Sequence, residues 1–552
     1  MVNRIQESNT MESSYLNFEF LNWDIIESIQ IIRATLAPLR LTRWQMFKYM
    51  VASLFRDIQP SSMILLALVS LVSLAFLMTW AKGRDPIEKI GLPVVGGSKQ
   101  HKLDFKQAVE EGRRLYPETP YIIKTQGLPY IVFPCHVFDE IKRLPERIAS
   151  AQDFFVKTYF GKYTTAGTET PTLLKAVSVD LARSIPAKVP SRQEDAKYAM
   201  DEAIGSCPEW KEVKLFPAVT NIIAQMNACS FIGREAGRSK HWVNLVSKYP
   251  FQVMIGTFMI APVPRILQGL FAPLIFAAAI ITKWRMKWAI TPIIKKDMRE
   301  FLNTTDKKSL LRLTEDGKVP FTASLMTRYK PSEATLSQLL QDYITVAFES
   351  TPSSAAALYL LLRELAAHPE LLDILRDELR EVMVDGKLPK SHLGELRKMD
   401  SVMRESARAN PFSLLALYRL LRVPIQLSVG PTLPPGTLIC VDVHHITTSP
   451  ELWKEPEKFD GLRFHEIRKQ PGMENKYQFV STGADSPGWG DGTMACPGRL
   501  FANSTIKIAL AHLIMNYDFK YVEGQGIPVK TSLPNGSWNP GLDTKFLFKS
   551  RK

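Results

Sequence analysis

Cysteines are few in this chain, and they do not stand in pairs. The 552-residue sequence contains five of them, at Cys135, Cys207, Cys229, Cys440 and Cys496. This spacing does not favour a disulfide framework and indicates a reducing compartment. Neither C-x-x-C nor H-E-x-x-H occurs, so the clustered ligands of a tetrahedral zinc site are missing. The glycine-rich fingerprint of a dinucleotide-binding or flavin-binding domain is missing as well.

Basic charge is in excess but it is not concentrated. The net charge is +14, and Lys and Arg are scattered along the chain without a zinc-finger or RNA-binding signature. Nucleic acid is therefore not an expected partner. A basic surface that faces an acidic protein or an anionic lipid agrees better with this pattern. With 45% apolar residues, the chain can also bury a large core.

One long uncharged run lies near the start of the chain. Residues 61–80 carry no charged side chain and can cross a hydrocarbon core about 30 Å thick. Because charged residues follow directly and no small-residue cleavage site does, we expect one retained transmembrane anchor. Residues 1–60 are expected to be an N-terminal extension outside the fold, unless translation starts at Met46 or Met50. The proline- and glycine-rich residues 81–97 are expected to form a hinge, followed by one folded domain at 98–552.

A second apolar segment, residues 259–282, is interrupted by three prolines and by Arg265. Proline breaks and an internal charge are unfavourable in a helix that spans lipid. We therefore expect a surface that dips into the membrane between two helices and admits lipophilic compounds. A second transmembrane span is the alternative. The surrounding residues 180–300 are mostly helical by pattern.

The segment Trp489–Ala502 carries the strongest chemical signal. Its glycine-rich first half ends in Cys496, and an apolar helical pattern follows. Cys496 is therefore expected at or just before a helix N-terminus, with Pro497 at the first helical position. The positive end of the helix dipole would stabilise a thiolate, which is a ligand for a soft metal. The glycines would let the backbone lie flat against a large planar group; they are Gly490, Gly492 and Gly498.

The spacing aromatic-x-x-Gly-x-x-x-Cys-x-Gly is present as Trp489, Gly492, Cys496 and Gly498. It resembles the haem-binding signature of the cytochrome P450 monooxygenases, and the run Ala-Cys-Pro-Gly-Arg-Leu-Phe-Ala, which includes Arg499, looks like its fungal form. The resemblance implies that Cys496 is the axial ligand of the haem iron and that the other four residues belong to the haem site. A lone buried cysteine used as a small apolar side chain is the alternative.

Two further positions bear on the haem propionates. Met494 stands where the family usually has an Arg or His that contacts a propionate. His444 matches a recurring fungal histidine and is a candidate for this contact. It lies in Leu433–His445, which is expected to form a turn and a strand. A histidine satisfied in the core or at the surface is the alternative.

Residues 338–367 are expected to form a long helix, where the family keeps its oxygen-handling helix. The acid-Thr pair of the family falls on Pro352 and Ser353, so this chain departs from the pattern. Pro352 lacks an N–H, and its ring pushes on the carbonyl of Phe348. We therefore expect the helix to open at this turn.

The same helix supplies the candidate catalytic residues. Ser353, together with Glu349 and Thr351, is expected to deliver protons to dioxygen in the opened turn. The alternative is that Thr351, Ser353 and Ser354 only cap a kink.

Glu405 and Arg408 stand three residues apart on a predicted helix that Pro411 ends. Arg463 lies in the segment Phe459–Phe464, which resembles the family segment whose Arg completes a Glu-Arg-Arg network beneath the haem. The resemblance implies a structural network of Glu405, Arg408 and Arg463.

Two other segments complete the pattern. Residues 121–134 alternate apolar side chains around a turn and predict a β-hairpin. Residues 149–167 are rich in aromatics, where the family's loop over the substrate pocket would lie. Core packing is the alternative role for those rings.

The resemblance implies a mainly α cytochrome P450 fold with a smaller β region, preceded by one N-terminal transmembrane helix. It implies a haem b monooxygenase that hydroxylates or oxidises a lipophilic small molecule. The expected substrates are terpenoid, meroterpenoid, polyketide or alkaloid intermediates of fungal secondary metabolism. Electrons from NADPH would arrive through NADPH-cytochrome P450 reductase, with cytochrome b5 as an additional donor. The expected location is the endoplasmic reticulum membrane, with the catalytic domain in the cytosol.

Two rival functions stay open at this point. The altered Pro352-Ser353 pair could serve an oxygen-independent haem-thiolate rearrangement or dehydration. The chain could also be a non-catalytic haem-binding sensor at the membrane, although the sequence shows no recognisable output domain.

Overall fold

The helix α15 (Leu336–Ala367) runs through the middle of the molecule. Thr335 caps its start, because its hydroxyl oxygen accepts the backbone N–H of Gln338 at 3.2 Å. The 32 residues make a helix about 48 Å long. It ends at His368, just before Pro369, which disfavours a helical residue in front of it. The predicted long helix is confirmed.

The computed structural model describes residues 70, 72–73, 87, 90–95, 105–123, 129–307, 309–311, 319–389, 392–525, 531–532, 538–539, 541 and 543–551. These residues all belong to one unit, Ser62–Lys552. The predicted extension 1–60 lies outside the described residues, as do most positions of the predicted anchor 61–80 and hinge 81–97.

Helices make up most of the described chain. Besides α15 they are α4 (Phe105–Leu115), α5 (Phe138–Lys142), α6 (Ala151–Thr158), α7 (Pro171–Lys175), α8 (Ala182–Ala203), α9 (Leu215–Phe231), α10 (Arg234–Gly237), α11 (Lys240–Ile260), α12 (Arg265–Ile275), α13 (Ala277–Asn303), α14 (Phe321–Arg328), α16 (Glu370–Val382), α17 (Arg397–Ala409), α18 (Val443–Thr448), α19 (Arg463–Ile467) and α20 (Arg499–Asn516). Shorter turns are η3 (Cys135–Val137), η4 (Ala176–Leu181), η5 (Ser309–Leu311), η6 (His392–Gly394), η7 (Pro487–Trp489) and η8 (Gly492–Met494).

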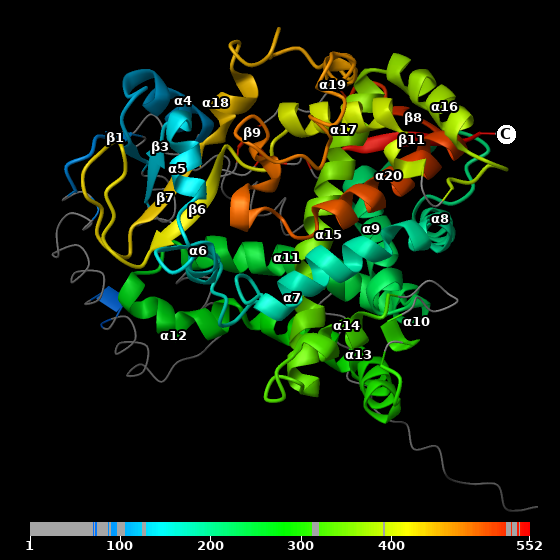
Figure 1. Ribbon diagram of the computed structural model, residues 1–552, viewed down its shortest axis with the longest axis horizontal. Coiled ribbons are helices and arrows are strands. Elements are labelled where there is room, and N and C mark those ends of the chain that lie inside the picture. Colours follow the sequence, from blue (N-terminus) through cyan, green and yellow to red (C-terminus); the bar gives the residue numbers. More distant parts are fainter. Residues whose placement is uncertain are drawn as a thin grey trace, which may run out of the picture. The chain divides into compact units, whose positions relative to one another are not determined.

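The strands form three sheets. The largest has the order β1-β2-β3-β7-β6-β4, the second has the order β5-β11-β8, and β9 pairs with β10. The strands are β1 (Val94–Val95), β2 (Tyr121–Ile123), β3 (Tyr130–Phe133), β4 (Ala149–Ser150), β5 (Lys211–Lys214), β6 (Leu415–Leu421), β7 (Leu438–Asp442), β8 (Tyr517–Tyr521), β9 (Thr531–Ser532), β10 (Trp538–Asn539) and β11 (Lys545–Ser550). Figure 1 shows the six-stranded sheet beside α4 and α5, with the β8–β11 pair near α16 and α20. The predicted hairpin is confirmed as β2 and β3, and the predicted strand as β7.

Two apolar cores meet on α15. Its first half packs with α9, α11, α13 and α14, and its second half packs with α8, α16, α17 and α20. Burial of these side chains removes apolar area from water at about 25 cal/mol per Å². The middle of α15 therefore lies at the junction of the two cores.

The apolar segment 259–282 folds as the end of α11, then α12, then the start of α13. Among the described residues, no single helix is both long enough and apolar enough to cross a membrane. The bent pair α12 and α13, which meet at 47°, reaches those limits only when its two helices are taken together.

Candidate functional site

Two glycines shape the loop that carries Cys496. Gly490 and Gly492 have φ values of +68° and +62°, a region that side chains with a Cβ rarely adopt. A Cβ on Gly490 would also lie 2.8 Å from the carbonyl oxygen of Met494. The loop can therefore fold back on itself, and the N–H of Cys496 donates to the carbonyl of Trp489 at 2.7 Å.

Backbone amides surround the sulfur of Cys496. Burial raises the pKa of this thiol, while hydrogen bonds from the N–H groups of Gly498 and Arg499 oppose the rise. These N–H groups are free to do so because α20 begins at Arg499, with Gly498 as its N-cap. Pro497 therefore precedes the helix, and the prediction that it takes the first helical position is wrong. The guanidinium of Arg499 donates to the Cys496 carbonyl at 3.0 Å.

The middle of α15 presents a stripe of accessible residues, the α15 stripe. Its members are Phe348, Glu349, Pro352, Ser353, Ala356 and Ala357. Their spacing places them on one helix face, whereas Thr351, Ser354 and Ala355 on the other side are buried. Protein atoms surround Glu349 densely although solvent reaches its side chain, so the stripe faces an internal space. The charge of Glu349 also raises the pKa of Cys496, so the two residues lie near each other.

Glu169, in the segment before α7, reaches the α15 stripe. Its carboxyl group lies close to that of Glu349 and interacts with it electrostatically. Burial, followed by the charge of Glu169, raises the pKa of Glu349 well above its ordinary range. The adjoining Thr168 accepts a hydrogen bond from Gln341 of α15 at 3.4 Å, which fixes this segment beside the helix. No motif around Glu169 in the sequence indicates this role.

The structure brings two of the three α15 candidates together. Glu349 and Ser353 share the stripe, and the Ser353 hydroxyl donates to the Glu349 carbonyl at 2.9 Å. Thr351 is only 1% exposed and lines a small cavity between α9, α11 and α15. It does not join the other two, because residues two apart on a helix do not face the same way.

Pro352 does not interrupt α15. The backbone stays helical from Leu336 to Ala367, so the expected opening is not a break in the helix. Side-chain donors nevertheless gather on the preceding turn. Asn227 of α9 donates to the carbonyl of Ser350 at 3.3 Å, and Ser353 donates to that of Glu349.

The predicted network of Glu405, Arg408 and Arg463 forms. Arg408 holds both oxygens of Glu405 at 2.8 Å, and Arg463 donates to Glu405 Oε2 at 3.1 Å. Glu405 is fully buried. The arginines also donate to backbone carbonyls of residues 447, 454, 456 and 458. This network therefore ties α17 to the chain that leads into α19.

His444 contacts Glu110. Its Nε2 lies 3.2 Å from a carboxylate oxygen of Glu110 on α4, and the side chain is buried. Burial lowers the pKa of the ring, and Glu110 opposes this. The geometry agrees with the alternative of a histidine satisfied inside the protein.

Arg419 is a buried cation that no motif in the sequence singles out. It lies on β6, is 2% exposed, and in the described part of the chain its Nε and Nη2 atoms have no hydrogen-bond partner. Burial lowers its pKa, which shows how poorly the charge is compensated. A buried guanidinium of this kind requires an anion. The signal in the sequence is an Arg at an inward position of a strand that is otherwise almost wholly apolar.

These features fit an iron porphyrin. The thiol of Cys496 supplies a soft ligand, and its surrounding N–H groups favour an anionic sulfur. A Cβ on Gly498 would have only Val177 within 4 Å, at 3.8 Å, so a planar group can approach the backbone there. Arg419 has the positive charge that could bind a propionate. Met494, at the position where the family usually has an Arg or His, has no such charge.

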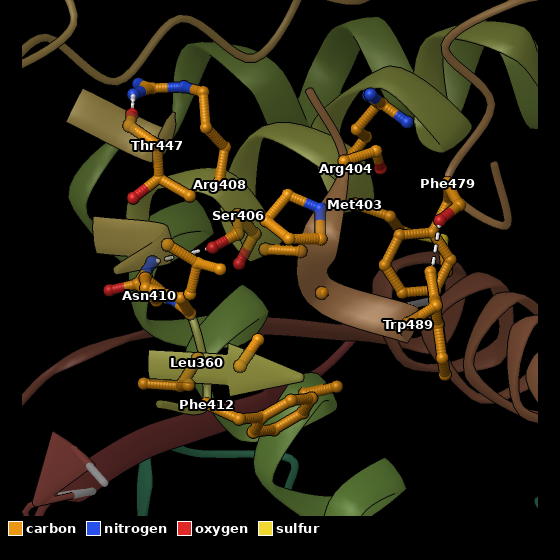
Figure 2. A pocket seen from close by; sticks show the side chains of 18 of the residues that line it. Leu360, Met403, Arg404, Ser406, Arg408, Asn410, Phe412, Thr447, Phe479 and Trp489 are labelled. Atoms are coloured by element: carbon orange, nitrogen blue, oxygen red, sulfur yellow. Dashed lines mark hydrogen bonds between the residues drawn. The ribbon is translucent and has the colours of Figure 1, made fainter. Parts of the chain in front are cut away.

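An apolar pocket of about 150 Å³ lies behind the loop, between α15, α17 and β6 (Figure 2). Its walls include Leu360, Met403, Phe412 and Trp489. Figure 2 shows the indole of Trp489 bonded to the carbonyl of Phe479, at 2.6 Å. Cys496 does not line this pocket.

Comparison with known proteins gives consistent results. The family model described as cytochrome P450 matches residues 254–548. The chain is 50% identical to cytochrome P450 monooxygenase ffsD of Aspergillus flavipes, over 96% of this chain and 99% of that protein. It is 46% identical to pyrichalasin C-18 hydroxylase of Pyricularia grisea, over 94% and 96% of the two chains.

A solved structure shows the same fold at low sequence identity. The retinoic acid-bound cyanobacterial CYP120A1 superposes with a TM-score of 0.61 at 16% identity. The alignment covers 83% of this chain and 99% of that one.

Proposed function

The chain belongs to the cytochrome P450 family and is a P450 monooxygenase, and we propose that it is a membrane-bound member that hydroxylates an apolar secondary metabolite. The observation that carries this proposal is the position of the Cys496 thiol. It lies beside the backbone N–H groups of Gly498 and Arg499 and near Glu349 of the α15 stripe. Family membership implies a haem-thiolate cofactor. When bound, haem would supply the activation of dioxygen, to which a thiolate ligand would contribute electron density.

The residues of the loop and of β6 hold the cofactor in this proposal. Cys496 would bind the haem iron, and the N–H groups of Gly498 and Arg499 would stabilise its negative charge. Gly498 would leave room for the porphyrin. Arg419 would bind a propionate, which would satisfy its buried guanidinium.

Protons come from the α15 stripe. Glu349, whose pKa burial and the neighbouring Glu169 raise, holds the proton, and Ser353 lies one helical turn from it. The Ser353 hydroxyl donates to the Glu349 carbonyl and retains lone pairs that can accept a proton. The pair of glutamates therefore replaces the acid of the usual acid-Thr pair, and Ser353 passes the proton on.

Electrons come from NADPH through a separate NADPH-cytochrome P450 reductase, with cytochrome b5 as a second donor. The chain has no nucleotide-binding fingerprint of its own, which supports this arrangement.

The substrate is a lipophilic intermediate of fungal secondary metabolism. The relative from Pyricularia grisea is named for hydroxylation of pyrichalasin at C-18, so a pyrichalasin-type compound is the first substrate to test. A terpenoid or meroterpenoid is the second. The aromatic segment supports an apolar entrance, because Phe155 and Val156 of α6 remain exposed while Phe154 packs in the core.

The membrane surface in this proposal is the outer face of α12 and α13. Large apolar side chains cover it, each more than half exposed: Ile266, Leu270, Leu274, Ile281, Trp284 and Trp288. The spacings of four residues on α12 and of three and four on α13 make two continuous stripes. A bilayer interface favours such a surface, with tryptophans at headgroup level.

Expression with a reductase tests the function. The reduced protein treated with carbon monoxide should show the red-displaced absorption of a thiolate-ligated haem, and Cys496→Ser should abolish it. Cys135→Ser, at another accessible cysteine, is the matched control. A wild-type protein without this absorption would overturn the proposal.

The products decide between this function and its rivals. We expect an added oxygen atom in the product, with a strict requirement for NADPH and dioxygen. A product formed without either one would favour the oxygen-independent rearrangement or dehydration.

A further inference from the structure

We propose that Asp400 is a positioning residue for the sulfur ligand, because its carboxylate joins both ends of the loop that carries Cys496 to α17. The proposal rests on the function proposed above, in which Cys496 binds the haem iron.

Asp400 is a buried carboxylate between two buried cations. Its Oδ1 lies 2.7 Å from Nζ of Lys507, and its Oδ2 lies 3.3 Å from Nη1 of Arg468. All three side chains are less than 10% exposed. A carboxylate with such partners is fixed in place, since moving it would leave the two cations buried and unpaired.

The first end of the loop is attached through Phe479. The N–H of Phe479 donates to Oδ2 of Asp400 at 2.9 Å. The Phe479 carbonyl accepts the indole N–H of Trp489 at 2.6 Å, a bond visible in Figure 2. The Trp489 carbonyl accepts the N–H of Cys496 at 2.7 Å. Three consecutive hydrogen bonds thus lead from Asp400 to the backbone of the ligand residue.

The second end is attached through Lys507. This residue lies on α20, the helix that begins directly after the loop, and its ammonium group also donates to the carbonyl of Leu393 at 3.1 Å. One carboxylate therefore fixes the distance between Phe479, which precedes the loop, and α20, which follows it. Outer contacts of this kind orient a metal ligand and tune its affinity.

Asp400 and Glu405 act on different segments, although both lie on α17. Glu405 contacts Arg408, Arg463 and the N–H of Asp460. None of these residues belongs to the loop. Loss of Glu405 should disturb the chain before the loop, whereas loss of Asp400 should disturb the geometry of the ligand itself.

The test replaces the charge but keeps the shape. In Asp400→Asn, we expect haem transfer to apomyoglobin to become roughly ten- to a hundredfold faster, the range found for outer-shell partners of metals. We also expect a larger share of the reduced carbon monoxide complex to lack the red-displaced absorption of thiolate ligation. The control is Asp195→Asn, which removes a buried carboxylate that pairs with Arg234 at 2.8 Å and, in the described part of the chain, forms no hydrogen bond or ion pair with the loop. The control should lower thermal stability without changing the share of thiolate-ligated complex.

The outcomes separate the two proposals. If the wild-type protein lacks thiolate ligation, the proposed function fails first. If the wild type shows it and Asp400→Asn transfers haem and absorbs like Asp195→Asn, the positioning role is overturned. Should Asp400→Asn not fold, Lys507→Met removes one attachment and leaves the Phe479 bond in place. A Lys507→Met protein with wild-type haem transfer and absorption would likewise overturn the role.

Discussion

The Cys496 sulfur experiences two opposing effects. Burial and the charge of Glu349 raise the pKa of its thiol, whereas two backbone N–H groups and the charge of Arg499 lower it. In the chain alone burial dominates. A bound metal ion would reverse this result, because coordination removes the thiol proton outright. The loop thus provides the hydrogen bonds that a thiolate needs before the metal supplies the larger charge.

Replacement of Ser353 by Ala should uncouple electron consumption from product formation. A positioned proton donor contributes about 10²–10⁴-fold to a rate, so product formed per NADPH consumed should fall by roughly tenfold or more. The measurement is the ratio of product to NADPH oxidised. Ser354→Ala is the matched control, because Ser354 is buried on the opposite side of α15. Unchanged coupling in Ser353→Ala would leave only the capping role for this hydroxyl.

The raised pKa of Glu349 predicts how product formed per NADPH should change with pH. Its raised pKa keeps the carboxyl protonated to higher pH than an ordinary glutamate, and the proton is lost as the pH rises through that value. Product formed per NADPH should therefore decrease with rising pH in the wild type. In Glu349→Gln this ratio should be low at every pH and should lack that step.

Glu169→Gln tests whether the two glutamates act as a pair. This substitution removes a charge that helps to raise the pKa of Glu349. The fall in product formed per NADPH should therefore occur at lower pH. A step that stays in place in both variants would assign the pH dependence to another group.

At the scale of elements, α17 holds two segments through two separate acids. Asp400 holds the loop of Cys496, and Glu405 holds the chain around residues 454–463. The two halves of α15 pack in different cores, and the middle of the helix carries the α15 stripe. The site is therefore placed where rigid elements meet, which limits the movement of its side chains.

Loss of Glu405 should prevent haem binding. Glu405→Ala would leave Arg408 and Arg463 buried without their anion, at a cost of roughly 3–5 kcal/mol. We expect mostly haem-free protein, measured as the ratio of haem to polypeptide after purification. Glu466→Ala on α19 is the control, because it removes an exposed ion pair with Lys469 that should contribute at most about 1 kcal/mol. A Glu405→Ala protein with full haem content would refute the structural role of the network.

At the scale of the whole molecule, apolar side chains collect on one outer face, that of α12 and α13. Soluble proteins rarely expose several large apolar residues side by side unless they bind something there. The net charge of +14 adds an attraction to anionic lipid. Together with the predicted anchor, this face would bring lipophilic substrates from the bilayer to the catalytic domain.

A polarity-sensitive fluorophore tests this face. Attached at Trp288→Cys, it should shift its emission to the blue when the full chain is placed in anionic phospholipid vesicles, because the ring position enters an apolar environment. The control is the same fluorophore at Trp210→Cys, a tryptophan that is 42% exposed and lies outside α12 and α13. Equal shifts at the two positions, or none at Trp288→Cys, would exclude contact between this face and lipid.

Local patterns in the sequence were sufficient for several elements and for the loop that carries Cys496. Glycine positions, a cysteine before an apolar helix and the i, i+3 pair of Glu405 and Arg408 act over a few residues, and the structure contains each of them. The same holds for α15 and for the hairpin of β2 and β3. These features depend on backbone geometry and on periodic burial, which short stretches of sequence determine.

Only the tertiary structure decided which distant side chains meet. Glu169 and Glu349, or Asp400 and Phe479, are brought together by the packing of separate elements, and no local pattern encodes such pairs. Packing also placed Thr351 against α9 and directed His444 toward Glu110. The sequence alone indicated Cys496 as a candidate metal ligand and predicted the long helix α15. The fold determined how the loop of Cys496 is held and which carboxyl group lies near its sulfur, because burial and electrostatic coupling depend on neighbours that are far apart in the chain.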